Sequence, residues 1–230
     1  RPGVQVSGHV EFRGTGNRPS ADQLRQFSVF IGLAQPPSRM YFNPTRSARP
    51  GGGSEFVIRD TAPGRYLTYA TDIPGWSLLA VTIGGRPLTE RAFTVETTDV
   101  ADVTVELTDQ PAEITGTVHN RAGAPDPDAG VLLFSTDRTR WRDARSATRT
   151  FRAARVSKAG SFSLTAVLPG EYFYVAVPDD TTANFPDATF LELLAPFARK
   201  VTIAAGDKQA VTLTTADVPA PRLPPPVERD

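Results

Sequence analysis

The sequence predicts an all-β protein built from two tandem β-sandwich domains. Two observations point to this fold class: short segments in which apolar and polar residues alternate, and a motif that occurs twice. The letters APGRYL at 62–67 return as LPGEYF at 168–173, an offset of 106 positions (64 to 170). A repeat of this length exceeds the ~20–50 residue period of solenoid proteins, so each copy is expected to be a whole small domain.

Further landmarks keep nearly the same spacing and set the domain boundaries. The offset is 106 for Phe56 and Phe162, Val95 and Val201, and Leu107 and Leu213, and 108 for Gly8 and Gly116. We therefore expect a first sandwich over 1–109, a second over 110–217, and a proline-rich extended tail over 218–230. The junction near 108–111 is short, which predicts sandwiches placed end to end with little freedom.

The strands follow in the same order in each copy. The first strand alternates apolar and polar positions from Val4 to Phe12, and again from Ile114 to His119, as a strand with one buried face does. Apolar runs at 27–33 and 131–134 suit central strands. Segments 55–59 and 161–165 follow glycines. The Pro-Gly pair is typical of a type II turn and leads into strands at 66–71 and 171–177. Each copy then closes with two more strands, at 92–96 and 103–107 and at 200–204 and 210–214.

Seven or so short strands per copy are the pattern of a β-sandwich. One segment of the second copy departs from it. Residues 189–199 are expected to form one or two helical turns with Leu191, Leu194 and Ala195 facing inward, and Pro196 limits their length.

Composition excludes several functions. The 230 residues carry 25 basic and 25 acidic side chains, so the chain has no overall attraction for nucleic acid or anionic membranes. The absence of cysteine excludes disulfides, thiol catalysis and cysteine-based zinc sites. No stretch approaches the ~18 consecutive apolar residues of a membrane span. The chain starts at Arg1 rather than Met, which suggests a processed form or a fragment of a longer protein.

The second copy resembles the carboxypeptidase regulatory-like domain, a transthyretin-like, Ig-like sandwich of the carbohydrate-binding-like fold group. The residues that carry the resemblance are Gly116-Thr-Val, Ala129 to Phe134, Gly160-Ser-Phe-Ser-Leu, Leu168 to Ala176 and Leu191 to Gly206. The first copy, with Gly75-Trp76-Ser-Leu-Leu and Gly84-Gly-Arg-Pro-Leu before Phe93, is similar to the divergent partner domain found upstream in such tandems. The resemblance covers 4–215.

The resemblance implies a fold and a location rather than a reaction. Such tandems are typical of acidobacterial-type envelope or secreted proteins, so an extracytoplasmic location is expected. The family has no shared catalytic set, and in metallocarboxypeptidases this domain stands beside a separate catalytic domain that this chain does not contain. The resemblance therefore implies no enzyme activity, no cofactor and no metal.

The candidate catalytic and metal-binding residues are few. His9 and His119 lie on outward positions of two different first strands, so a shared triad or two-histidine metal site is not expected. The acidic pairs at 126–128 and 179–180 lack the spacing of a calcium loop and fit ordinary turns better. Carboxylates alone would have to carry any chemistry, and they are scattered.

The basic stretch 138–158 is the sharpest local anomaly, with seven arginines, one lysine and a single acid, Asp143. If extended, it would form a hairpin with guanidinium groups on one side and the Trp141 indole on the other. Arginine forks suit carboxylates and phosphates, so an acidic partner, an anionic glycan or a lipid headgroup is a candidate ligand. The alternative is a solvated hairpin whose Trp141 packs on its own sheet. The candidate partner-binding residues are Arg138, Arg140, Trp141, Arg142, Arg145, Arg149 and Trp76.

We therefore expect a non-catalytic structural or protein-interaction module, a subunit or fragment of a larger envelope assembly. One alternative is a glycan-binding module that uses Trp76, Trp141 and Tyr41 as stacking rings. Another is an accessory domain of a hydrolase whose catalytic part lies outside the chain. Nucleic acid is not an expected partner, because the basic stretch contains only Trp141 and Phe151 as stacking aromatics.

Overall fold

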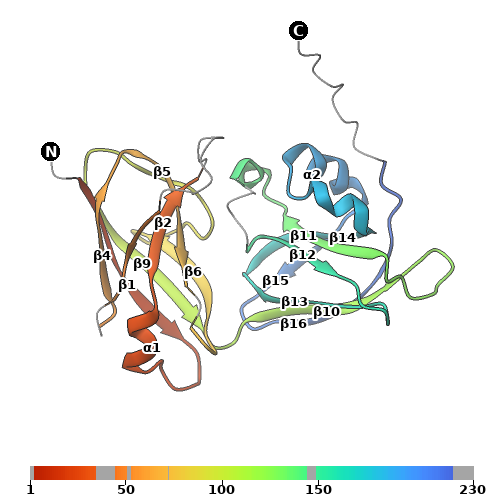
Figure 1. Ribbon diagram of the computed structural model, residues 1–230, viewed down its shortest axis with the longest axis horizontal. Coiled ribbons are helices and arrows are strands. Elements are labelled where there is room, and N and C mark those ends of the chain that lie inside the picture. The colour runs from red at the N-terminus through yellow and green to blue at the C-terminus, as the bar shows by residue number, and fades with distance from the viewer. Residues whose placement is uncertain (1–2, 35–44, 51–52, 72, 144–148, 220–230) are drawn as a thin grey trace, which may run out of the picture.

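The computed structural model describes residues 3–34, 45–50, 53–71, 73–143 and 149–219, which form four β-sheets. Figure 1 shows two blocks along the chain, one built from the first half and one from the second. The predicted all-β class with a short helical element in the second block is confirmed.

The first block pairs a five-stranded sheet with a four-stranded one. The five-stranded sheet has the order β4-β1-β9-β6-β7, in which β1 runs parallel to β9. The four-stranded sheet has the order β3-β2-β5-β8. The elements are β1 (Val4–Arg13), α1 (Ala21–Gln26), β2 (Val29–Leu33), β3 (Thr45–Ala48), β4 (Glu55–Thr61), β5 (Gly64–Ala70), β6 (Ser77–Ile83), β7 (Arg86–Pro87), β8 (Phe93–Val95) and β9 (Val100–Thr108).

The second block repeats this plan with fewer strands and more helix. Its sheets have the orders β13-β10-β16 and β12-β11-β14-β15. The elements are β10 (Ala112–His119), β11 (Ala129–Ser135), η1 (Arg138–Asp143), β12 (Phe151–Arg155), β13 (Ser161–Val167), β14 (Gly170–Pro178), η2 (Asp179–Asn184), α2 (Ala188–Leu194), η3 (Ala195–Phe197), β15 (Arg199–Ile203) and β16 (Lys208–Thr214).

Each block is a sandwich because the apolar sides of its two sheets share one core. In the first sandwich Val10 and Val105 of one sheet pack in the same cluster as Ile31 of the other. In the second, Ile114 packs with Val131 and Leu133 across the sheets. Because alternate residues of a strand face opposite sides of the sheet, these inward positions account for the alternation of apolar and polar residues in the sequence.

The β11 strand is buried on both sides, which explains its unbroken apolar run. All seven of its residues are buried. Leu132 and Phe134 face a second apolar cluster that also contains Leu191 and Leu194 of α2. The predicted helical turns are therefore present, and their leucines cover the outer side of the β11–β14 sheet (Figure 1).

Each sandwich contains an equivalent hydrogen bond from a tyrosine hydroxyl to a backbone carbonyl. The Tyr66 hydroxyl donates to the Ala62 carbonyl at 3.0 Å, and the Tyr172 hydroxyl donates to the Leu168 carbonyl at 2.9 Å. Such tyrosine corners tie a strand to the turn that precedes it. The Pro-Gly-x-Tyr motif is thus conserved between the copies for a structural reason.

The first and last strands show that the copies match at an offset of 108 rather than 106. A Cβ on Gly8 would lie 1.8 Å from the Val103 carbonyl oxygen, and one on Gly116 would lie 2.0 Å from that of Val211. The Val103 position thus corresponds to Val211, and Val105 to Leu213. The sequence match of Leu107 with Leu213 is wrong, because Leu213 lies opposite Val118, whereas Val105, and not Leu107, lies opposite the equivalent Val10. The match of Val95 with Val201 is wrong in the same way, since Val95 lies opposite Gly64 and Ile203 lies opposite the equivalent Gly170.

The connection between the fifth strand and the next edge strand differs between the copies. In the first sandwich it supplies β6 and β7, and β6 pairs with β9. In the second it supplies η2, α2 and η3, which cover the outer side of a sheet instead. Neither β6 nor α1 was predicted from the residues.

Candidate functional site at the interface of the two sandwiches

The first part of the arginine-rich stretch is helical, so the expected extended hairpin is wrong there. Residues 138–143 form η1 because Asp137 begins the turn: its carboxylate accepts from the Thr139 N–H at 3.0 Å and the Thr139 hydroxyl at 2.6 Å. An aspartate in this position satisfies backbone groups that an extended strand would leave to water. Arg145 lies outside the described residues, and Arg142 is described only as part of η1.

Neither tryptophan is an exposed ring. Trp141 is 4% exposed, donates from its indole N–H to the Ser135 carbonyl at 2.8 Å, and meets Phe134 edge to face. Trp76 is 7% exposed and packs edge to face on Phe12. Stacking a sugar requires an open ring face, so these two cannot serve as platforms. Tyr41, the third ring considered, lies outside the described residues.

The arginines at the start of the stretch contact neighbouring acids. Arg138 lies over the Trp141 ring at 5.4 Å and pairs with Glu192 of α2 at 3.1 Å. Arg140 lies 3.8 Å from Asp137, and its side chain is only 19% exposed. Arg149 and Trp76 line the same groove of about 700 Å³ between the sandwiches.

The centre of the interface is Glu90, which sequence reasoning missed. Glu90 follows β7 in the first sandwich and is 4% exposed. Its carboxylate accepts from the Arg149 N–H at 2.6 Å, the Thr150 N–H at 2.5 Å and the Thr150 hydroxyl at 2.7 Å, all in the second sandwich. A buried carboxylate of one sandwich is therefore bound by a three-donor cradle of the other.

An ion pair flanks this contact. Arg91, next to Glu90, donates to the carboxylate of Asp137 in the second sandwich. The same aspartate faces Arg140, and the three side chains line a small cavity of about 280 Å³ with Tyr172. Among the described residues, the buried Arg140 Nε has no hydrogen-bond partner.

Burial dominates the electrostatics of Glu90. Removal from water raises the pKa of the Glu90 carboxyl, against the opposing effects of the Thr150 hydroxyl and the Arg149 and Thr150 N–H groups. Burial and then the Glu90 charge raise the pKa of the Tyr172 phenol. Burial, followed by the charge of Arg91, lowers the pKa of Arg140.

Asp137 shifts in the opposite direction. Burial acts to raise the pKa of its carboxyl, but hydrogen bonds from Thr139 and the charges of Arg91 and Arg140 outweigh it and lower that pKa. The interface thus places an ionised aspartate among arginines, next to a glutamate that is harder to ionise.

The junction between the sandwiches is also held in place. The Asp109 carboxylate accepts from the Thr15 N–H at 3.1 Å and the Gly16 N–H at 2.5 Å. The Gln110 side-chain amide donates to the Thr15 hydroxyl at 3.1 Å. These contacts fix the junction to the loop that follows β1.

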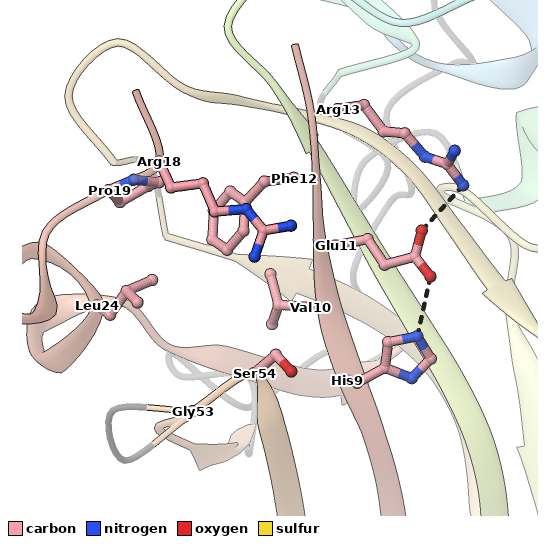
Figure 2. Close-up of a pocket in the computed structure, with 10 residues that line it drawn as sticks. All are labelled: His9, Val10, Glu11, Phe12, Arg13, Arg18, Pro19, Leu24, Gly53 and Ser54. Atoms are coloured by element: carbon pink, nitrogen blue, oxygen red, sulfur yellow. Dashed lines mark hydrogen bonds and ion pairs between the residues drawn. The ribbon is translucent and has the colours of Figure 1, made fainter. Parts of the chain in front are cut away.

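A second polar site lies on β1 (Figure 2). His9 and Arg13 lie on either side of Glu11: the His9 Nε2 is 3.1 Å from one carboxylate oxygen and an Arg13 nitrogen is 2.9 Å from the other. These residues, with Arg18 and Leu24, line an open groove of about 600 Å³. His9, Glu11 and Arg13 point to one side of the strand, whereas Val10 and Phe12, which also line the groove, point to the other side, toward Arg18 and Leu24.

This triplet does not form a catalytic arrangement. The hydrogen bond from His9 contributes most to lowering the pKa of Glu11, so its carboxylate is engaged by the histidine and the arginine. In the described segments His9 is hydrogen-bonded to Glu11 and to no serine or threonine hydroxyl, which a nucleophilic mechanism would need. His119 lies on β10 in the other sandwich. Among the described residues, no group of three or more histidine, aspartate or glutamate side chains could hold a metal ion.

Glu90 gave no signal in the sequence. It stands in a short polar segment, and its backbone φ of 49° is rare for a residue other than glycine. No helix or strand pattern includes it, and its partners are 59 and 60 positions away. The one available hint was the short junction, which predicted restricted freedom without naming a contact.

Comparison with known proteins finds weak similarity to solved structures and no match to a family model or curated protein. The resemblance to the carboxypeptidase regulatory-like family therefore has no support beyond the sandwich fold. In the part of the chain that the structure describes, no helix is long and apolar enough to span a membrane.

Several solved structures of bacterial surface proteins are similar to this chain. The minor pilin of Streptococcus agalactiae is 12% identical, covers 96% of this chain and 99% of its own, and has a TM-score of 0.35. The shaft pilin SpaA of Lactobacillus rhamnosus GG is 11% identical over 94% of this chain and 98% of its own, with a TM-score of 0.30.

The Bacillus anthracis TIE protein is 11% identical over 93% of this chain, with a TM-score of 0.31. This chain spans 33% of the length of that protein. At such identities and TM-scores, no role of these proteins transfers to this chain.

Proposed function

We propose that this chain is a non-catalytic structural and protein-interaction module of an extracytoplasmic bacterial protein, with the sandwiches of residues 1–109 and 110–217 held as one rigid unit. The observation that carries the proposal is the buried Glu90 carboxylate bound by Arg149 and Thr150 of the other sandwich. A buried, hydrogen-bonded carboxyl group fixes geometry, because any displacement leaves it without partners.

The polar groups chemically able to take part in catalysis are engaged with each other. Asp137 is bound by Thr139 and paired with Arg91, and Glu11 is bound by His9 and Arg13. Such mutual pairing supports a structural role better than a catalytic one. The resemblance of the second sandwich to carboxypeptidase regulatory-like domains is consistent with this role, and the envelope location and larger assembly are part of the proposal.

We propose Arg138 as the residue that contacts the partner. Of the candidate arginines with described side chains, it is the exposed one, with 61% of its side chain accessible, whereas Arg140 and Arg149 are half-buried. Its neighbour Glu192 satisfies it only in part, and arginine forks bind acidic side chains of a partner well.

Affinity capture tests the proposal. The chain, after mild crosslinking of intact cells, is captured from the envelope fraction and from the medium, and the bound proteins are identified. We expect a stoichiometric protein partner, with recovery reduced at least fivefold by Arg138→Glu and unchanged by Arg155→Glu, an exposed arginine of β12. Recovery of the chain alone, or of a catalytic domain in the same polypeptide, would overturn the proposal.

A further inference from the structure

The last strand is internal to its sheet in the first sandwich and at the edge of its sheet in the second. β9 lies inside its sheet, between β1 and β6. The corresponding strand β16 pairs with β10 on one side only and is an edge of its sheet. The difference arises because the connection that supplies β6 in the first sandwich forms α2 in the second.

The free edge of β16 presents a row of backbone groups. The Glu113 N–H donates to the Asp207 carbonyl, and the Thr215 N–H donates to the His119 carbonyl, so odd-numbered residues of this segment face β10. The N–H and C=O groups of Ala210, Thr212 and Thr214 therefore point away from the sheet. In the described part of the chain, the Arg199 side chain donates a hydrogen bond to this edge, at the Thr212 carbonyl, over 3.5 Å.

The burial of equivalent side chains shows that, within the described segments, β16 lacks a neighbouring strand on one side. Val103 of β9 is 1% exposed, whereas Val211, which has the same place in β16, is only half-buried. Ile83 of β6 pairs with Val103. Nothing equivalent flanks Val211 among the described residues. A strand added to β16 would complete the second sandwich as β6 completes the first.

The edge also lacks the usual protection. Exposed edge strands are normally blocked by charges, proline or a bulge. The neighbouring edge, β15, begins with Arg199 and Lys200, but β16 has a single charge, Lys208 at its start, and no proline or register shift.

We propose that a second copy of this chain pairs with β16, strand to antiparallel strand, about a two-fold axis at Thr212. In this register Val211 lies opposite Leu213 of the other copy on the core side, and Ala210 lies opposite Thr214. The outward N–H and C=O groups of both strands then bond to each other. This inference concerns the second sandwich alone and does not depend on the proposed function.

The pairing of Val211 with Leu213 and of Ala210 with Thr214 makes β16 complementary to itself about Thr212, which favours a second copy as the occupant. The one charged residue of β16 is at its first position, so antiparallel copies hold the two Lys208 ammonium groups at opposite ends. A single pair of seven-residue strands is expected to bury less surface than the ~1,200 Å² of stable complexes. The dimer is therefore expected to be weak and concentration-dependent. Arg199 must leave the Thr212 carbonyl for the strands to pair.

A single-cysteine crosslink tests the register, since the chain has no cysteine of its own. Hydrogen-bonded antiparallel residues have Cα atoms about 5.5 Å apart, within the ~4.4–6.8 Å that a disulfide spans. Under mild oxidation, Thr212→Cys is expected to form a covalent dimer at least tenfold faster than Thr165→Cys, an exposed residue on the opposite edge strand β13. Equal rates for the two variants would overturn the register.

Sedimentation velocity from about 5 μM to 1 mM tests the pairing itself. We expect a dimer at high concentration for the wild-type chain and for Thr212→Ala, more dimer for Arg199→Ala, and monomer throughout for Thr212→Pro. Proline removes an N–H that faces solvent in the monomer, so folding should be retained, as circular dichroism would verify. A wild-type chain that stays monomeric at 1 mM, or equal dimerisation of Thr212→Pro, would overturn the proposal. If Thr212→Pro does not fold, the crosslinking rates decide.

Discussion

The Thr150 hydroxyl lies 2.7 Å from the Glu90 carboxylate, although the two residues are 60 positions apart and belong to different sandwiches. Together with the N–H groups of Arg149 and Thr150, this contact binds the two sandwiches through one buried side chain.

Removing the Glu90 carboxylate should destabilise the chain strongly. Glu90→Ala leaves the Arg149 and Thr150 donors without an acceptor, which is expected to lower the free energy of unfolding by about 2–4 kcal/mol. Urea denaturation measures this change. Glu96→Ala, at an exposed position after β8, serves as the control and should change stability by less than about 0.5 kcal/mol. Similar losses in both variants would contradict the assignment.

The stability that Glu90 contributes should fall as the pH rises. Because burial raises its pKa in the folded chain, the folded state holds the proton above the ordinary glutamate pKa of about 4.3, and stability is lost as the pH increases through the raised value. Urea denaturation from pH 5 to 8 should show a decline for the wild type that Glu90→Gln lacks.

Other groups near Glu90 do not obscure this result. Asp137 has a lowered pKa, so its contribution is lost only as the pH falls below about 4. Burial raises the pKa of the Tyr172 phenol, so this group stays neutral from pH 5 to 8, and His9 and His119 are present in both variants. Parallel pH profiles for wild type and Glu90→Gln would show that Glu90 does not titrate in this range.

The Arg91–Asp137 pair should contribute a modest coupling. Both side chains are partly exposed, at 43% and 29%, so screening by solvent limits the interaction to about 0.5–1 kcal/mol. A double-mutant cycle with Arg91→Ala and Asp137→Ala isolates this term from the separate role of Asp137 in starting η1. Additive effects of the two substitutions would mean that the pair does not join the sandwiches.

The two tyrosine corners should differ in strength. Tyr172→Phe removes a hydroxyl from a side chain that is 2% exposed, which is expected to cost about 1–2 kcal/mol, because the Leu168 carbonyl loses its partner in a dry site. Tyr66→Phe, where the bond is only partly buried, should cost about 1 kcal/mol or less. Thermal or urea unfolding of both variants measures the order, and a larger loss for Tyr66→Phe would contradict it.

The strands were predictable from sequence where burial follows a simple period. β1 and β10 show alternation, β11 shows the continuous apolar run of a strand covered on both sides, and the leucines of α2 were placed correctly. These features depend on local patterns and on the repeat.

The interface was not predictable in this way. Glu90 has no periodic neighbour, and its role depends on contacts across 60 positions. The alternation of the arginine-rich stretch favours an extended hairpin, but the Asp137 turn that starts η1 outweighs that pattern. β6 was missed because nothing in one copy indicates that its connection forms a strand while the other forms a helix.

A distance measurement between the two sandwiches tests the central claim most directly. Spin labels at Val57→Cys on β4 and Thr202→Cys on β15, both exposed, report this distance by double electron–electron resonance. Rigid sandwiches held through Glu90 predict a single narrow distribution in the wild-type background and a clearly broader one when Glu90→Ala and Arg91→Ala are added. A broad distribution in the wild-type background would contradict the account.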